Sequence, residues 1–177
     1  YKGDLKYLLI EVVSIKENSI AKISDKIIVA EELLDSFIDE TSIEKFNIKL
    51  KLEGKELEGT ILKHPLFDKG YDFEVPLLEA DFVTTEQGTG FVHIAPGHGA
   101  DDFELGREHS LPTPETVEDD GFLKETLPLF GGLHVLRDNE KMADILTEYE
   151  CLIGRGTINH SYPVSYTHLR AHETDIN

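Results

Sequence analysis

Along the chain, the spacing of apolar residues changes irregularly between the pattern of a strand and the pattern of a helix. This succession of predicted strands and helices constrains the fold more than any other feature. Residues 5–15 are rich in β-branched and aromatic side chains, and residues 26–29 predict a second short strand. Residues 46–52 alternate apolar and polar side chains, which is typical of a half-buried strand. Between these strands, residues 30–38 carry apolar side chains at helical spacing.

The second half of the chain continues the mixture. Residues 75–78, 81–85 and 91–94 predict three further short strands. Asp101 is a plausible N-cap for a helix ending near residue 110, because Glu104 follows three residues later. A last amphipathic helix is predicted around residues 142–149, where the apolar side chains recur at helical spacing.

Strands and helices therefore do not alternate regularly, which argues against a doubly wound parallel sheet. We expect a mixed α/β (α+β) fold, with a twisted, barrel-like core of short strands flanked by short helices. The 177 residues suit one domain and can bury a core without disulfides or structural metal.

The formal net charge of −18 limits the ways in which this chain can use nucleic acid. Affinity for phosphate backbones comes mainly from lysine and arginine, so the chain alone should bind RNA poorly and touch only an end of it. No segment has the length of apolar sequence that a membrane span needs, and no signal peptide is recognisable. The single cysteine, Cys151, fits a core position and a reducing compartment, and we expect that compartment to be the cytoplasm. We also expect a monomer.

The most concentrated chemistry lies in residues 88–102, which read GTGFVHIAPGHGADD. Glycines allow positive φ angles and close approach of a ligand to the backbone. A strand that leads through such a loop into a helix N-terminus can present N–H donors and carboxylates to a ligand. The polar side chains that this segment offers are His93, His98, Asp101 and Asp102.

Three interpretations of this segment remain open from the residues alone. It could be a tight loop with solvated polar side chains. It could be a metal site of His93, His98, Asp101 and Asp102, although the two histidines match no zinc spacing. It could also be a metal-free pocket, in which a carboxylate binds an ammonium group and a histidine positions a polar substrate atom or water.

The longer segment QGTGFVHIAPGHGADDFELGREHSL resembles the signature of the editing (connective-polypeptide) domain of class I isoleucyl-tRNA synthetases. The flanks resemble the same family in the same order: GKELEGT, HPLF, DFVT, VEDDGFL, PLFGGLHV and HSYP. Valyl- and leucyl-tRNA synthetases have related editing domains, and the GHGADDF form favours the isoleucyl branch. The resemblance covers residues 1–163, which we therefore expect to form the editing domain.

The resemblance implies post-transfer editing, in which a positioned water hydrolyses mischarged aminoacyl-tRNA, chiefly valyl-tRNA carrying the isoleucine acceptor. Asp102 matches the aspartate that holds the α-ammonium group of the mischarged amino acid, and a carboxylate suits that role. His93 matches the histidine that lines the small side-chain pocket and helps to exclude the larger cognate. The implied reaction needs no cofactor and no metal, whereas the parent enzyme would use ATP and Mg²⁺.

The remaining residues of the segment receive secondary roles. Gly88, Thr89 and Gly90 are expected to shape the pocket floor and to contribute backbone groups. Asp101 is interpreted mainly as a helix cap, with substrate binding as the alternative. His98 is interpreted mainly as a loop histidine bonded to backbone, with contact to the 3′ adenosine as the alternative.

Structural interpretations are favoured elsewhere. We expect His64, before Pro65, to be structural. We interpret the acidic run at residues 118–120 as a solvated turn. The implied partners are the 3′ end of tRNA, its noncognate aminoacyl group and the remainder of the synthetase, with no membrane partner.

The sequence departs from the family in three places. The threonine-rich wall of the pocket is expected shortly before Tyr1, and it does not occur in this chain. The HIGH and KMSKS motifs of the synthetic site are missing, so no aminoacyl-adenylate synthesis is expected. Residues 164–177 do not resemble the family, and we expect this tail to be disordered or poorly packed.

Three functional hypotheses follow. The first is the editing hydrolase, which the missing threonine wall could leave weakly active or inactive. The second is a metal-dependent hydrolase that uses the two histidines and two aspartates of residues 88–102. The third is a non-catalytic module that binds an amino acid or a tRNA end.

Overall fold

The computed structural model describes residues 1–86 and 88–156, and the tail at residues 164–177 and the HSYP motif lie outside them. The first third of the chain builds an antiparallel sheet in the order β2-β1-β3. Its strands are β1 (Lys6–Ile15), β2 (Lys26–Ala30) and β3 (Ile43–Glu53). The predicted strands are thus confirmed, with β3 longer than the alternating pattern indicated.

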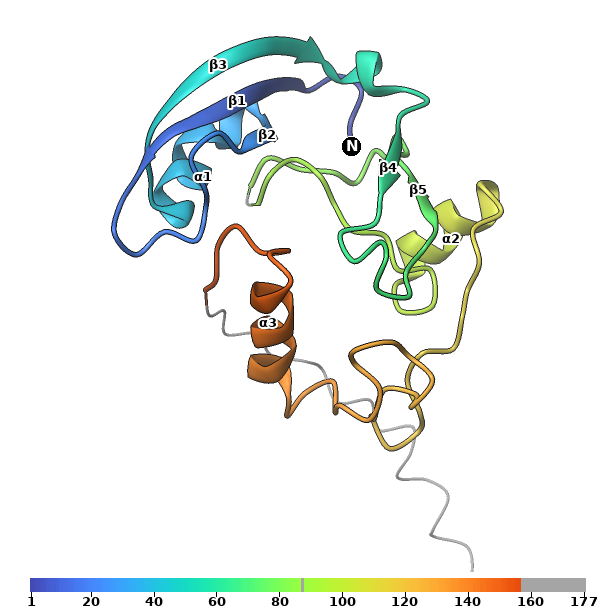
Figure 1. The fold of residues 1–177 in the computed structure, drawn as a ribbon. Coiled ribbons are helices and arrows are strands. Elements are labelled where there is room, and N and C mark those ends of the chain that lie inside the picture. Colours follow the sequence, from blue (N-terminus) through green and yellow to red (C-terminus); the bar gives the residue numbers. More distant parts are fainter. Residues whose placement is uncertain (87, 157–177) are drawn as a thin grey trace, which may run out of the picture.

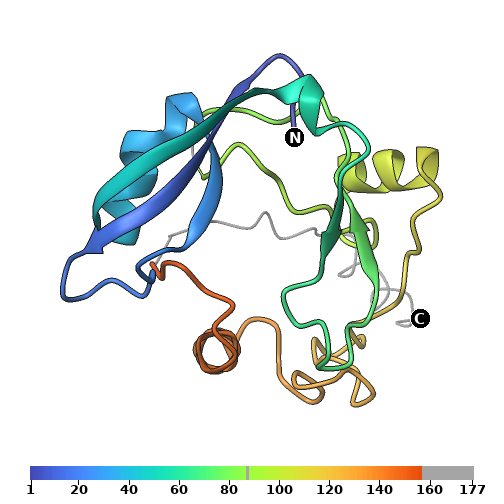
Figure 2. The same cartoon turned by 45° about the horizontal axis from the view of Figure 1, so that its top comes forward.

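One face of this sheet is covered by helix α1 (Leu34–Thr41), which the short 3₁₀ helix η1 (Glu31–Leu33) precedes (Figures 1 and 2). The predicted helix at residues 30–38 is therefore confirmed as a helical segment with shifted ends. Leu8, Ile10 and Val12 of β1 are almost fully buried and form a core with Phe37 of α1. Burial of apolar surface in this layer drives the folding of the first third.

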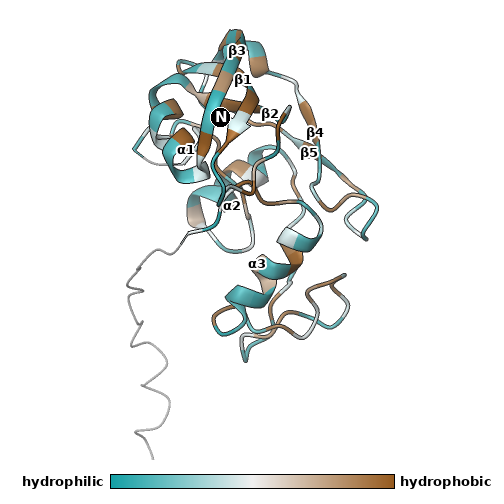
Figure 3. Cartoon of the chain, turned by 60° about the vertical axis from the view of Figure 1, so that its left-hand side comes forward, coloured by the Kyte–Doolittle hydropathy of each residue, from teal (hydrophilic) through white to brown (hydrophobic). Residues whose placement is uncertain are grey.

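Strand β3 is partly open to solvent. Hydrophilic and hydrophobic colours alternate along β3 (Figure 3), and Ile48 and Leu50 are about half exposed, at 47% and 49%. Register shifts between β1 and β3, including one at Leu9/Ile10, interrupt the pairing. Such bulges bend and twist a sheet locally.

A second, two-stranded antiparallel sheet pairs β4 (Ile61–Lys63) with β5 (Glu74–Pro76). The 3₁₀ helix η2 (Gly54–Leu57) connects β3 to β4. The expected strand at residues 75–78 is shorter and begins earlier than predicted, and β4 was not predicted. The strands predicted at residues 81–85 and 91–94 are wrong, because the structure leaves both segments outside the two sheets.

The described part of the chain shows no closed barrel, so the barrel-like part of the expected fold is not confirmed, while its mixed α/β character is. Helix α2 (Ala100–Glu108) lies beside the β4–β5 ladder, and α3 (Asn139–Glu148) follows a long irregular segment (Figure 1). No helix among the described residues is both long and apolar enough to cross a membrane.

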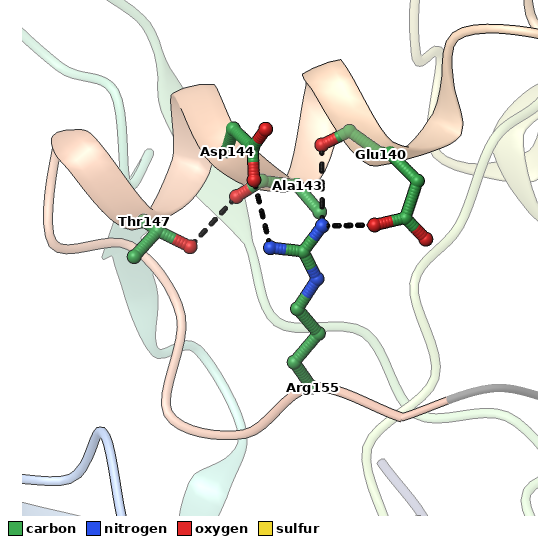
Figure 4. Close-up of polar contacts among 5 residues, drawn as sticks. All are labelled: Glu140, Ala143, Asp144, Thr147 and Arg155. Atoms are coloured by element: carbon green, nitrogen blue, oxygen red, sulfur yellow. Dashed lines mark hydrogen bonds and ion pairs between the residues drawn. The ribbon is translucent and has the colours of Figure 1, made fainter.

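Arg155 attaches the end of the described chain to α3 (Figure 4). Its guanidinium group donates to Asp144 at 2.8 Å and also bonds the carboxylate of Glu140. These two acids are one helical turn apart, so a planar guanidinium can reach both. The acidic partners raise the pKa of Arg155, chiefly through the hydrogen bond to Asp144.

Candidate functional site

The loop at residues 88–90 is fixed by the strands beneath it. The backbone N–H of Ala30 donates to the Thr89 carbonyl at 2.8 Å, and the Tyr7 hydroxyl donates to the Gly90 carbonyl at 2.8 Å. Burial is the first cause that raises the pKa of Tyr7, so this phenol keeps the proton that it donates. The loop is therefore anchored to the ends of β1 and β2.

Gly90 is required at its position. Its φ angle is +79°, and a Cβ atom there would lie 2.5 Å from Cβ of Ala30. Gly88 also has a positive φ, but a Cβ atom there would meet nothing within 4 Å. The GTG motif thus secures a close approach between the loop and the first sheet, and its roles in the pocket floor and in substrate binding stay a prediction.

The segment that follows the loop forms one wall of a cavity of about 300 Å³. The Phe91 ring packs against Tyr7 at a centroid distance of 4.8 Å, which directs the segment away from the first sheet. The cavity lining is mainly apolar and comes from segments far apart in the sequence: Tyr1, Leu62, Val75, Pro76, Leu77, Leu78, Ala80, Val83, Phe91, Val92, His93, Ile94 and Leu111.

The chemistry of the cavity suits a small, mostly apolar ligand group. Its volume is at the lower end of the range for ligand pockets, which is about 300–1,000 Å³. His93 is exposed and brings an imidazole to the lining. The structure thus places His93 on a cavity wall, as predicted. Its part in excluding a larger amino acid stays a prediction.

Asp102 lies in the first turn of α2, where its charge interacts favourably with the helix dipole. The N–H of Ala95 donates to its Oδ2 atom at 3.1 Å. Ala95 directly follows His93 and Ile94 of the cavity wall, so the Asp102 carboxylate is bonded to the backbone next to that wall. Asp102 itself is not among the residues that line the cavity.

Asp101 does not cap the helix as predicted. The N-cap is Gly99, with extended backbone angles, and Asp101 is an exposed residue of the first turn. Glu104 pairs with Arg107 instead of completing a capping box. The helix begins earlier than predicted, because the backbone is extended at Gly99 and helical from Ala100. The carboxylate that accepts a backbone N–H here is that of Asp102, which bonds Ala95.

His98 lines a different cavity from His93. Its Nε2 atom lies 3.3 Å from the Thr116 hydroxyl. The ring therefore contacts a side chain and not the backbone group that was predicted. His98 lines a second cavity of about 480 Å³ together with Phe103 and the segment from Thr113 to Glu118. Neither His93 nor Asp102 lines this second cavity.

The metal alternative is not supported by the arrangement of the side chains. Among residues 1–86 and 88–156, no three His, Cys, Asp or Glu side chains come together as a group that could hold a metal ion. His93, His98, Asp101 and Asp102 therefore do not assemble into the four-ligand site considered above.

His64, expected to be structural, belongs to an aromatic cluster next to β4. Its ring stacks on Tyr71 at 4.9 Å and lies 5.0 Å from the Phe73 ring, measured between centroids. Its Nδ1 atom accepts the Leu66 N–H at 3.0 Å. Burial first, and the charge of His93 second, lower the pKa of His64 below its ordinary value.

Sequence reasoning missed most of the cavity wall. Leu62 and Val75 pair across the β4–β5 ladder and both line the cavity, although β4 carries no alternating pattern that would mark it. The apolar residues Val92 and Ile94 were attributed to a strand, yet they line the cavity instead. No local signal distinguishes these two uses of an apolar side chain.

Comparison with known proteins identifies the family of the chain. A family model described as leucyl-tRNA synthetase, editing domain, matches residues 11–129. The chain is 41% identical to the isoleucine–tRNA ligase of Gluconobacter oxydans and 42% identical to that of Pelagibacter ubique, over 94% of this chain in each case. That of Idiomarina loihiensis is 38% identical over 97% of the chain. The chain spans only 18% of the length of the first two relatives.

Proposed function

Because this chain belongs to the editing domains of class I aminoacyl-tRNA synthetases, in the isoleucine–tRNA ligase branch, we propose that it hydrolyses mischarged aminoacyl-tRNA. The substrate in this proposal is chiefly valyl-tRNA carrying the isoleucine acceptor. A synthetic pocket built for isoleucine gains only about 1–3 kcal/mol from one methylene group, so valine is poorly rejected there. A second, smaller site can remove the wrong product.

The observation that carries this proposal is the position of the Asp102 carboxylate relative to the cavity wall. The Ala95 N–H bond holds Asp102 next to the segment that contains His93 and Ile94. An ionised carboxylate offers about four lone-pair sites, so Asp102 can accept this N–H and also bind an ammonium group. A charge-assisted hydrogen bond of this kind is about twice as strong as a neutral one.

In the proposed arrangement, the aliphatic side chain of the mischarged amino acid enters the apolar cavity, and its α-ammonium group binds Asp102. His93 lies on the cavity wall and orients the attacking water or the terminal ribose. The ester carbonyl is then attacked by water, the acyl–oxygen bond breaks, and the ribose hydroxyl leaves with a proton. Proximity and orientation supply much of the rate, without a covalent enzyme intermediate.

The net charge of −18 supports contact with the tRNA end alone. A domain that neutralised many phosphates would need a basic face, and its affinity would fall steeply with salt. The remainder of the synthetase is therefore proposed to hold the tRNA body while this domain receives the 3′ end.

The experiment compares two esters of the same tRNA. The chain is mixed with valyl-tRNA and, separately, with isoleucyl-tRNA, both on the isoleucine acceptor, and the remaining ester is followed over time. The proposal expects faster hydrolysis of the valyl ester than of the isoleucyl ester. Equal rates for both esters, or rates no greater than without protein, would contradict it.

A further inference from the structure

Tyr1 is paired with the stretch of chain that follows β5. Its amino group donates to the Leu78 carbonyl at 2.9 Å, and its carbonyl accepts the Ala80 N–H at 2.8 Å. Bonds from one residue to both neighbours of Glu79 are the pattern of a parallel strand pair. Tyr1 therefore lies beside the β4–β5 ladder as a single residue of a parallel strand (Figure 1).

The edge that Tyr1 occupies continues along β5 towards the start of that strand. The Leu77 N–H donates to the Thr60 carbonyl at 2.9 Å, on the side of β4. In an antiparallel ladder the main-chain groups of successive residues face alternate edges, so those of Pro76 and Leu78 face away from β4. Within the described part of the chain, no protein group bonds the Leu78 N–H or the Pro76 carbonyl. A donor and an acceptor thus lie in line with Tyr1.

These two groups fit one further residue of an extended peptide. In a parallel pair, the second residue before Tyr1 lies opposite Leu77. There it can donate to the Pro76 carbonyl and accept the Leu78 N–H. Its side chain points to the same side as those of Tyr1 and Leu77, which both line the cavity of about 300 Å³. An apolar side chain therefore suits this position.

Pro76 limits the length of such a pairing. Proline has no N–H, so a peptide residue opposite Val75 meets the Glu74 carbonyl but no donor. The same proline leaves the β4–β5 ladder intact, because its nitrogen faces the outer edge. The edge therefore fits a short segment and not a long strand.

The electrostatics of Tyr1 favour an uncharged segment. Burial first lowers the pKa of the Tyr1 amino group, and the negative charge of Glu79 opposes this effect. A peptide N–H in place of the ammonium group can still donate to the Leu78 carbonyl. It does so without the cost of removing an ion from water.

We propose that the outer edge formed by Pro76 and Leu78 is a strand-addition site. It binds a short extended peptide segment, parallel to β5 and continuous with Tyr1, which is uncharged and directs an apolar side chain to the cavity. Main-chain hydrogen bonds supply affinity in such sites, and pockets for alternate side chains supply specificity. The bound segment extends the cavity wall from Tyr1, whether or not the chain hydrolyses an ester.

The test joins a four-residue extension, Val-Gln-Val-Gln, to the amino group of Tyr1 in the full 177-residue chain. Its third residue is the one that lies opposite Leu77 in the proposed pairing. A matched extension, Val-Gln-Pro-Gln, has the same length but lacks the N–H that donates to the Pro76 carbonyl. The natural chain without an extension is the reference.

The readout is hydrogen exchange of single backbone amides, followed by NMR. We expect the Val-Gln-Val-Gln extension to slow exchange of the Leu78 N–H by roughly 3- to 10-fold, the scale of one hydrogen bond, and the proline extension to slow it less. The Val75 N–H faces β4 and should exchange equally in all three proteins. This readout is independent of ester hydrolysis, so its failure is distinguishable from failure of the proposed function.

Unchanged exchange of the Leu78 N–H in a folded, extended protein would overturn the proposal. Equal slowing by both extensions would also overturn it, because the pairing requires the donor to the Pro76 carbonyl. If the four-residue extension prevents folding, the shorter extension Val-Gln still supplies the residue opposite Leu77. We then expect the same slowing at Leu78, and an unchanged rate would overturn the proposal.

Discussion

The backbone N–H of Ala95 donates a hydrogen bond to Oδ2 of Asp102 at 3.1 Å, and this contact closes the loop that opens α2. Through it, the carboxylate is fixed next to the cavity wall that contains His93. Two roles of Asp102 can therefore be separated by mutation. One is structural, since its Oδ2 atom accepts the Ala95 N–H. The other is the proposed binding of a ligand ammonium group by the negative charge of the carboxylate.

The first prediction concerns the structural task. Asp102→Ala should lower the free energy of unfolding by about 1–3 kcal/mol, because it leaves the Ala95 N–H without its acceptor. Asp102→Asn should cost less, since the amide oxygen can accept the same N–H. Asp101→Ala, the neighbouring control, should lose only the helix-dipole term of about 0.3–1 kcal/mol. Urea unfolding measures all three, and equal losses for the two Asp102 variants would contradict the prediction.

The second prediction concerns the anchor of the loop at residues 88–90. Tyr7→Phe removes the hydroxyl that donates to the Gly90 carbonyl and accepts the Lys2 N–H. We expect the free energy of unfolding to fall by about 1–3 kcal/mol, since the buried carbonyl of Gly90 loses its donor. Tyr149→Phe, at a half-buried ring on the surface, is the control. A Tyr7→Phe protein as stable as this control would show that the anchor matters little.

Parts of the fold were predictable because they rest on local spacing. The helical spacing in α1 reflects one face buried against the core, where Phe37 lies, whereas α3 and most of β3 formed as predicted although their side chains are only partly buried. The segment at residues 91–94 was predicted as a strand because its apolar side chains fit one. A strand also needs a neighbouring strand for its backbone hydrogen bonds, and this segment has none. The spacing of its apolar side chains does not reveal that they line a cavity.

The site was predictable to a similar degree. The motif predicts Asp102 and His93 as site residues, and the structure places His93 on the cavity wall and bonds Asp102 to the Ala95 N–H beside it. The wall opposite comes from β4, β5 and the residues around Val83, which are brought together only by the fold. His64 is interpreted as structural, and its stacking on Tyr71 and its bond to the Leu66 N–H agree with that interpretation.

The third prediction follows from the lowered pKa of His64. The unfolded chain binds a proton at His64 at a higher pH than the folded chain, so protonation favours unfolding. This contribution to stability is fully present above the ordinary pKa of 6.5 and is lost as pH falls through the folded-state pKa. Relative to His64→Asn, the natural chain should therefore lose stability on acidification.

The measurement is urea unfolding of the natural chain, His64→Asn and the control His109→Asn at a series of pH values. The stability difference between the natural chain and His64→Asn should shrink below pH 6.5. A difference that stays constant, or that grows with acid, would contradict the lowered pKa.

The fourth prediction is that hydrolysis does not depend on a bound transition metal. The described histidines and acidic side chains form no metal-binding group, and the proposed water is oriented by His93. Treating the chain with a transition-metal chelator should leave the rate of deacylation unchanged. Loss of activity that added zinc restores would favour a metal-dependent hydrolase.

The most direct test of the proposed function is hydrolysis of valyl-tRNA by Asp102→Asn, beside the natural chain and the control Asp101→Asn. The Asn side chain keeps the bond to Ala95 but loses the charge that would bind the ammonium group. Calorimetry with a non-hydrolysable valyl-adenosine amide shows, in parallel, whether each protein still binds the ligand.

The account predicts that Asp102→Asn hydrolyses the ester roughly 10- to 150-fold more slowly, which corresponds to losing a charged hydrogen bond of about 1.5–3 kcal/mol. Asp101→Asn should remain close to the natural rate. A folded Asp102→Asn protein that hydrolyses valyl-tRNA at the natural rate would contradict the role of Asp102. Binding of the amide without hydrolysis of the ester by the natural chain would contradict the hydrolase and leave a binding module.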